Sequence, residues 1–185
     1  MCFVDHSKRP RVVVSKCLGF AHCRYNGRII QDEIVAELKQ SIEFLPICPE
    51  VAIGLGVPRS PLRIVEVDRK LRLCQIDTGR DLTAEMNAFG ARYIRSLTDI
   101  DGFVLKSGSP SCGIRDVRIH RGIHAHAKTY CGHGVFAGLV MDSLPWLPIA
   151  DELRLHNTRA REQFVTQLQA LAAHRRRLPN CRRDS

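Results

Sequence analysis

The chain has 185 residues, of which 44% are hydrophobic and 25% are charged, as in soluble globular proteins. No apolar stretch approaches the roughly 20 residues that a bilayer-spanning helix needs. The opening residues 1–8 also lack the apolar core of a secretory signal. We therefore expect a cytoplasmic protein with one main domain and no membrane partner.

The net charge of +9 is densest near the C-terminus. Residues 1–150 hold 20 Lys/Arg against 15 Asp/Glu, whereas residues 151–185 hold 8 against 4. Excess positive charge favours encounters with phosphate-rich partners, of which RNA is the obvious candidate. In many basic proteins, however, the excess charge only keeps the surface hydrated. Charge alone therefore does not decide between RNA binding and a charged surface without a nucleic-acid partner.

Three short apolar runs are typical of buried β-strands, and each leads into a cysteine. Residues 11–17 end at Cys17, residues 43–48 end at Cys48, and residues 102–106 lead through a Ser-Gly-Ser-Pro-Ser loop to Cys112. In an open α/β sheet, ligands gather beyond the carboxyl ends of the strands. The three thiols can therefore meet although they lie far apart in the sequence.

The other predicted elements complete an α/β pattern. Asp32 is a candidate cap for a short helix, residues 51–61 form an ordered Gly/Pro-rich loop, and residues 62–67 form a strand. A longer helix carries an apolar stripe that we interpret as core packing: Leu82, Met86, Phe89, Tyr93 and Leu97.

Towards the C-terminus the pattern is less regular. Residues 116–120 favour a strand, residues 122–134 a loop, and a helix begins near Val135. Residues 145–157 are typical of a linker, and a last helix starts near Thr158 and ends in a basic tail. We predict an open, mainly parallel sheet with helices on both faces and a C-terminal helical tail.

Eight cysteines in a chain of this length, without a secretory signal, favour metal binding or reactivity over disulfides. Cys2 and Cys181 lie in ends that we expect to fray, and Cys74 is interpreted as a buried small hydrophobe. The spacing of Cys17, Cys48 and Cys112 does not match the Cys-x-x-Cys pairs of structural zinc sites. Three thiolates suit an iron-sulfur cluster that leaves one iron open, and Cys23 competes for a place among them.

Two short motifs add polar groups near these thiols. Cys48-Pro-Glu50 places a carboxylate two residues beyond a strand-end thiol, where an acid or base is useful, although a solvated glutamate in a turn is the alternative. In the loop from Ser109 to Gly113, serine hydroxyls and backbone N–H groups can face an anionic ligand. The histidine-rich stretch provides a rival zinc site: His124, His126, Cys131 and His133.

With these motifs the chain resembles the thiouracil desulfidase (TudS-like) family. The matching segments are residues 15–17 with 23–27, 48–59, 79–83 and 105–113, and the likeness covers about residues 11–143. The resemblance implies that Cys17, Cys48 and Cys112 ligate a 4Fe-4S cluster whose fourth iron binds the sulfur of a thiolated pyrimidine. It also implies that Glu50 and Ser109 are the polar catalytic residues.

The implied reaction replaces the sulfur by oxygen without net redox change. The open iron polarises the carbon–sulfur bond, and water activated by Glu50 attacks the carbon. Arg24, Arg59, Lys106 and Ser111 are the candidate substrate-binding residues on charge and location.

The resemblance divides the chain into a desulfidase domain at residues 1–147 and a linker, helix and basic tail at residues 148–185. The second part is similar to the start of an additional domain in relatives that act on 4-thiouridine in tRNA, so tRNA is a further candidate partner. A non-catalytic RNA-binding module with a structural iron-sulfur or zinc site is the alternative, and a zinc hydrolase is a third interpretation.

Overall fold

In the computed structural model, which describes residues 9–122 and 127–177, the first apolar run forms strand β1 (Arg11–Ser15). Val12 and Val14 belong to one apolar cluster and Val13 to another, because successive strand residues face opposite sides of a sheet. All three valines are fully buried. Burial on both faces is typical of a central strand in a parallel sheet.

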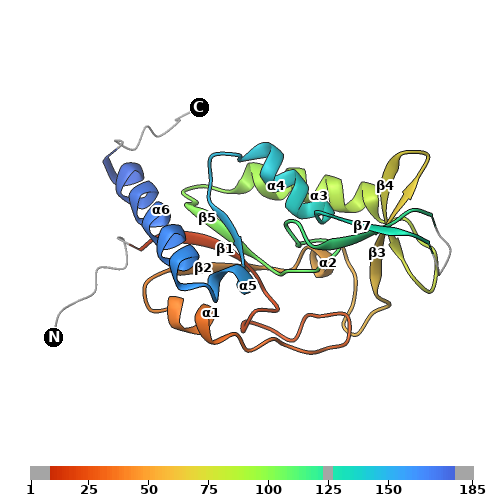
Figure 1. Cartoon of the computed structure of the whole chain (residues 1–185), viewed down its shortest axis with the longest axis horizontal. Helices are drawn as coiled ribbons and strands as arrows, with labels where there is room; N and C mark the ends of the chain where they lie inside the picture. The colour runs from red at the N-terminus through yellow and green to blue at the C-terminus, as the bar shows by residue number, and fades with distance from the viewer. Residues whose placement is uncertain (1–8, 123–126, 178–185) are drawn as a thin grey trace.

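The first sheet is entirely parallel and has the order β2-β1-β5-β8 (Figure 1). Its other strands are β2 (Glu43–Ile47), β5 (Gly102–Leu105) and β8 (Ile149–Asp151). The predicted α/β class and parallel sheet are confirmed. Residues 149–151, however, were expected in a linker, and that expectation is wrong because β8 pairs with β5 and Ala150 is buried.

Helices cover both faces of this sheet. On the side of Val12 and Val14 lie α1 (Glu33–Leu38), α5 (Glu152–Leu155) and α6 (Thr158–Arg177). On the side of Val13 lie α3 (Thr83–Ser96) and α4 (Val135–Ser143). Asp32 caps α1 as predicted, because its carboxylate accepts a hydrogen bond of 2.9 Å from the backbone N–H of Val35.

A second sheet, which the sequence analysis did not separate, has the order β4-β3-β6-β7. It consists of β3 (Leu62–Val67), β4 (Lys70–Gln75), β6 (Val117–His120) and β7 (Thr129–Gly132). The prediction of a loop over residues 122–134 is therefore wrong for the four residues of β7, which pairs antiparallel with β6. Cys74 was expected to be a buried small hydrophobe, but it lies on β4 and is only partly buried.

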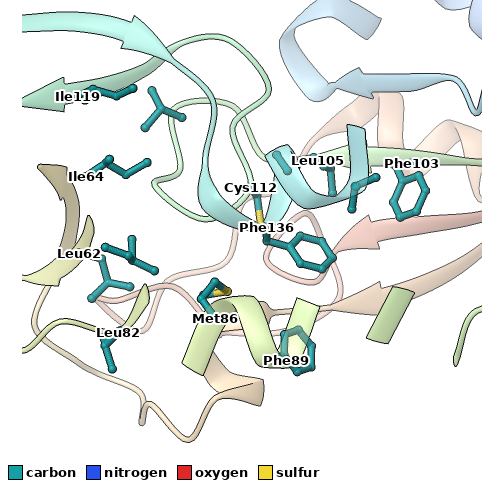
Figure 2. Close-up of a cluster of buried hydrophobic side chains, with 14 of the residues drawn as sticks. Leu62, Ile64, Leu82, Met86, Phe89, Phe103, Leu105, Cys112, Ile119 and Phe136 are labelled. Carbon is teal, nitrogen blue, oxygen red and sulfur yellow. The ribbon is translucent and has the colours of Figure 1, made fainter. Parts of the chain in front are cut away.

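One apolar cluster joins the two sheets, and Figure 2 shows it. Leu62 and Ile64 of β3 pack there with residues of α3 and α4 and with the inner residues of the parallel sheet. The predicted stripe of α3 is confirmed as core, because Leu82, Met86 and Phe89 are buried and Tyr93 and Leu97 pack against the same cluster. Among the described helices, none is long and apolar enough to cross a bilayer.

Candidate active site

The carboxyl ends of the parallel strands meet at one edge of the sheet and bring the predicted thiols into a single cavity. Cys17 follows β1, Cys48 follows β2, and Cys112 lies in the loop after β5. These three thiols and Cys23 line a cavity of about 290 Å³, which we call the cysteine pocket. The predicted convergence of thiols at this edge is therefore present.

Hydrogen bonds between the strand ends hold this edge together. The backbone N–H of Lys16 donates to the carbonyl of Ile47 at 2.8 Å, which joins the ends of β1 and β2. The hydroxyl of Ser15 accepts from the backbone N–H of Lys106 at 2.9 Å, which joins the ends of β1 and β5. These hydrogen bonds fix the strand ends that Cys17 and Cys48 follow, and the start of the loop that carries Cys112.

The thiols of the pocket interact with one another. A hydrogen bond with Cys17, ahead of partial burial, raises the pKa of Cys23 to about 11. A hydrogen bond with Cys23, together with burial, raises the pKa of Cys48 well above its usual range. Burial raises the pKa of Cys112 to about 12, against the opposing effect of a hydrogen bond with Ser15. Each of these shifts favours the protonated thiol, and binding of a metal would release the proton.

The donor set of the pocket fits an iron-sulfur cluster. Among the described residues, no three His, Cys, Asp or Glu side chains close around one point as the ligands of a single ion do. A cluster differs because each thiolate binds a separate iron, so its ligands surround a larger volume. All cysteines in the described ranges are free, and soft thiolate donors favour iron-sulfur chemistry.

Glu50 is a nearly buried carboxylate beside the thiols. It lies in α2 (Pro49–Ala52), a short helix inside the segment that follows β2. The guanidinium of Arg59 donates to one carboxylate oxygen of Glu50 from Nε at 2.9 Å and from Nη2 at 2.7 Å. The hydroxyl of Ser111 donates to the other oxygen at 2.9 Å. Both oxygens are therefore oriented by hydrogen bonds, and Glu50 lines the cysteine pocket.

The loop from Ser109 to Gly113 is organised by its first serine. The hydroxyl of Ser109 accepts from the backbone N–H of Ser111 at 3.3 Å and of Cys112 at 3.1 Å. Ser109 lines the pocket, whereas Ser111 is completely buried. This burial favours a role for Ser111 in orienting Glu50 over the predicted contact with substrate.

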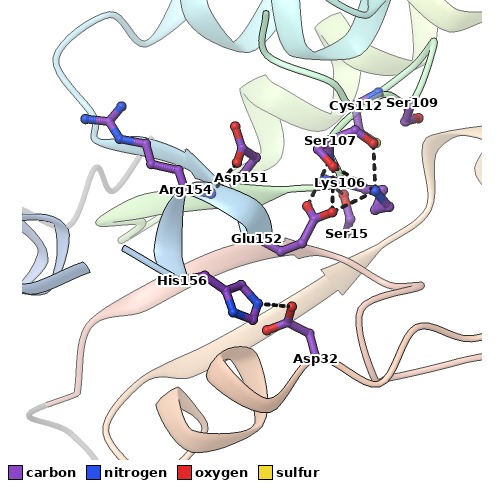
Figure 3. A network of polar contacts seen from close by, with 10 residues as sticks. All are labelled: Ser15, Asp32, Lys106, Ser107, Ser109, Cys112, Asp151, Glu152, Arg154 and His156. Carbon is purple, nitrogen blue, oxygen red and sulfur yellow. Dashed lines mark hydrogen bonds and ion pairs between the residues drawn. The ribbon is translucent and has the colours of Figure 1, made fainter. Parts of the chain in front are cut away.

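Lys106 belongs to a buried polar network that Figure 3 shows. Its ammonium donates to Glu152 at 2.6 Å and to the Ser107 hydroxyl and carbonyl, both at 2.8 Å. Glu152 also accepts from the backbone N–H of Ser107 at 2.9 Å and from its hydroxyl at 2.6 Å. Glu152 thereby connects α5 to the loop that carries Cys112.

The sequence analysis missed Glu152 because it assigned residues 145–157 to a linker. The available signal was the acidic pair Asp151-Glu152 directly after the short run from Leu147 to Ala150. That arrangement is the same strand-end placement that identified Cys48 and Glu50.

The remaining predicted residues divide between the pocket and other places. Arg24, Arg59 and Lys106 line the pocket. In the rival zinc set, Cys131 is exposed on β7 and His133 follows that strand, while His124 and His126 lie outside the described residues.

Fold and site together define an α/β protein with a thiol-lined pocket at the carboxyl edge of a parallel sheet. Residues 12–152 match the 2-thiouracil desulfurase family, so the chain belongs to this family and the predicted resemblance is confirmed. The chain is 30% identical over 136 residues to the uncharacterized protein YbbK of Bacillus subtilis (strain 168), a match that covers 70% of this chain and 88% of YbbK.

A solved structure supports the same assignment. The fold is similar to that of a [4Fe-4S]-dependent thiouracil desulfidase, TudS, with a TM-score of 0.64 and 27% sequence identity. The similarity covers 84% of this chain and 99% of the TudS chain.

Proposed function

We propose that this protein removes sulfur from a thiolated uracil, with a [4Fe-4S] cluster held by Cys17, Cys48 and Cys112. The observation that carries the proposal is the delivery of these three thiols, with Glu50, into one pocket from three separate strand ends. The products are the oxo base and hydrosulfide: water supplies the oxygen, and no electrons are exchanged.

The cluster contributes one kind of chemistry to this reaction. Held by the thiolates of Cys17, Cys48 and Cys112, a bound cluster would supply a Lewis-acidic iron with affinity for a thiocarbonyl sulfur. The geometry of the other residues indicates what the chain itself contributes.

In this proposal Glu50 accepts a proton from the attacking water. Arg59 holds one carboxylate oxygen through two donors, and Ser111 holds the other, so the carboxylate cannot rotate away from the pocket. A fixed carboxylate avoids reorganisation during proton transfer. Arg59 and Ser111 are in this proposal positioning residues for Glu50.

Arg24 and Ser109 line the pocket and can face the substrate, whereas the three donors of the Lys106 ammonium, which also lines the pocket, are taken by Glu152 and Ser107. A pyrimidine presents carbonyl oxygens and ring nitrogens, which a cation or a hydroxyl donor can recognise. The Ser109 oxygen already accepts two backbone N–H groups, so its own proton is available for donation to the substrate.

The size of the pocket bears on the substrate. A cavity of about 290 Å³ lies just below the range for small-ligand pockets, roughly 300–1,000 Å³, and the cluster would take part of it, so the remaining space suits one pyrimidine ring. The same base could also be presented as 4-thiouridine within tRNA. The basic last turn of α6, residues 174–177, would attract the phosphates of such an RNA. We place the reaction in the cytoplasm, where thiols remain reduced.

Anaerobic reconstitution with iron and sulfide tests the proposal. We expect a brown protein that releases sulfide from 2-thiouracil, from 4-thiouridine or from tRNA that contains 4-thiouridine. Turnover of a free base should hardly respond to salt, whereas activity on tRNA should fall as salt rises. A colourless protein without activity on any of the three substrates after competent reconstitution would reject the proposal.

A further inference from the structure

The second sheet has one apolar face and one basic face. Its apolar face carries core residues such as Leu62, Ile64 and Ile119. The residues that alternate with these point to the opposite side, which we call the outer face. The outer face consists of Arg63, Val65, Val67, Lys70, Arg72, Cys74, Arg118, His120, Thr129 and Cys131. Among these strand residues are four Lys or Arg, one His and no Asp or Glu.

The charges of the outer face are accessible to a partner. Lys70, Arg72 and Arg118 are exposed, whereas Val65 near the centre is fully buried. Long basic side chains cover apolar atoms in this way with their aliphatic stems. Arg72 also forms an ion pair of 3.0 Å with Asp81. Both partners are exposed, and such a pair contributes little, so Arg72 can exchange Asp81 for another anion.

A cavity of about 330 Å³ connects the outer face with the cysteine pocket. Arg63, Arg118 and His120 line this cavity, together with the carboxylate residue Asp116. Three of its lining residues also line the cysteine pocket: Leu62, Gly108 and Pro110. The two cavities therefore share a wall, and a molecule bound in one lies next to the other.

The surroundings of His120 show that positive charge dominates this cavity. Burial, followed by the positive charges of Arg63 and Arg118, lowers the pKa of His120. Its Nδ1 atom is buried and has no hydrogen-bond partner within the part of the chain that the structure describes. An anion in the cavity would offset the mutual repulsion of these side chains.

We propose that the outer face of the second sheet binds the phosphate backbone of RNA. One phosphate occupies the cavity at Arg63 and Arg118, and its neighbours lie along Lys70 and Arg72. A single phosphate would need only the cavity, whereas the cations extend over the three adjacent strands β4, β3 and β6. A polyanion therefore matches the face better than a small anion does.

This inference deepens the proposed function, on which it rests for the thiolated base. A base next to the anchored phosphate lies at the wall that the cavity shares with the cysteine pocket. The basic last turn of α6 is not part of this surface, because β3, β4 and β7 lie at the opposite end of the molecule from α6 (Figure 1). The two basic regions can thus be tested separately.

The test measures the affinity of the reconstituted full-length protein for a fluorescein-labelled, unmodified tRNA transcript. Fluorescence anisotropy gives Kd at several salt concentrations between about 50 and 200 mM. Arg118→Gln and Lys70→Gln each remove one cation from the outer face. The matched controls Arg92→Gln and Arg95→Gln each remove one exposed cation from α3, which packs against the apolar face.

We expect Kd to rise roughly five- to eightfold at 0.1 M salt in each outer-face variant, the effect of losing one phosphate contact. The slope of log affinity against log salt should become smaller by about one. Both controls should bind like wild type. Equal losses in all four variants would reduce the effect to net charge and overturn the docking surface, and so would unchanged binding in the outer-face variants.

Inorganic phosphate, added at constant ionic strength, separates RNA from a small anion. Phosphate that binds through Arg118, while RNA affinity is the same in Arg118→Gln and wild type, would assign the cavity to a small anion only and overturn the proposal. Unmodified RNA has no sulfur to remove, so its binding does not depend on turnover. Absence of sulfide release by wild type would instead reject the proposed function, so the two failures are distinguishable.

Discussion

The buried carboxylate of Glu152 should contribute far more to stability than an exposed carboxylate of the same type. Glu152 is 3% exposed and accepts hydrogen bonds from the Lys106 ammonium and from two donors of Ser107. Glu152→Ala removes the counter-charge of the Lys106 ammonium and leaves two neutral donors of Ser107 without their acceptor. We expect this substitution to reduce the free energy of unfolding.

The size of the loss in unfolding free energy depends on how well Lys106 and Ser107 are solvated once the carboxylate is gone. Removal of one member of a buried ion pair costs about 3–5 kcal/mol. The Lys106 side chain is 19% exposed and can turn partly towards water, so we expect a loss of about 3 kcal/mol, the lower end of that range. Glu152→Gln keeps one acceptor oxygen and should lose less.

Urea unfolding of the reduced, metal-free protein measures this difference. Glu162→Ala, which removes an exposed carboxylate from α6, is the matched control and should stay within about 0.5 kcal/mol of wild type. A loss below about 1 kcal/mol for Glu152→Ala would show that water replaces the carboxylate and would refute the reasoning.

Three further predictions concern the pocket and pH. Cys112→Ser should sharply reduce the iron bound per protein after reconstitution, and iron content equal to that of wild type would contradict its assignment as a ligand. Glu50→Gln should keep the cluster absorbance but lower kcat by roughly 10²–10⁴-fold, the usual contribution of a general base, so an unchanged kcat would exclude that role. A hydrogen bond with Asp32 raises the pKa of His156, so this contact stabilises the fold below the unfolded pKa and is lost as pH rises through the higher folded pKa. Thermal melts of His156→Gln should therefore show a deficit at pH 5.5 that disappears at pH 9, and a deficit independent of pH would contradict this expectation.

Much of the site could be predicted because its residues stand at strand ends. A run such as Val12-Val-Val14 is apolar enough to identify a buried strand, and parallel strands place their carboxyl ends together. Cys17, Cys48 and Cys112 could therefore be grouped before any contact was known. The polar partners of Glu50 could not be predicted from the sequence, because Arg59 and Ser111 contact it only once the loops have folded.

The errors have a common physical cause. β7 has four residues, β8 has three, and neither carries a long apolar run, so their strand character comes from pairing with β6 and β5. Pairing partners are distant in sequence, and β-structure depends strongly on context. The same context brought Glu152 to Lys106, which lies 46 residues earlier in the chain.

Local patterns in this chain specify the α/β class, the apolar face of α3, the cap of α1 and the cysteines that follow the buried strands, because each depends on neighbouring residues. Which of those thiols share a pocket with Cys23, and which carboxylates face which cations, was decided by the order β2-β1-β5-β8 and by the loops at its edge. The reason is that hydrogen bonds and ion pairs act over a few ångströms, and only the folded chain brings their partners within that distance.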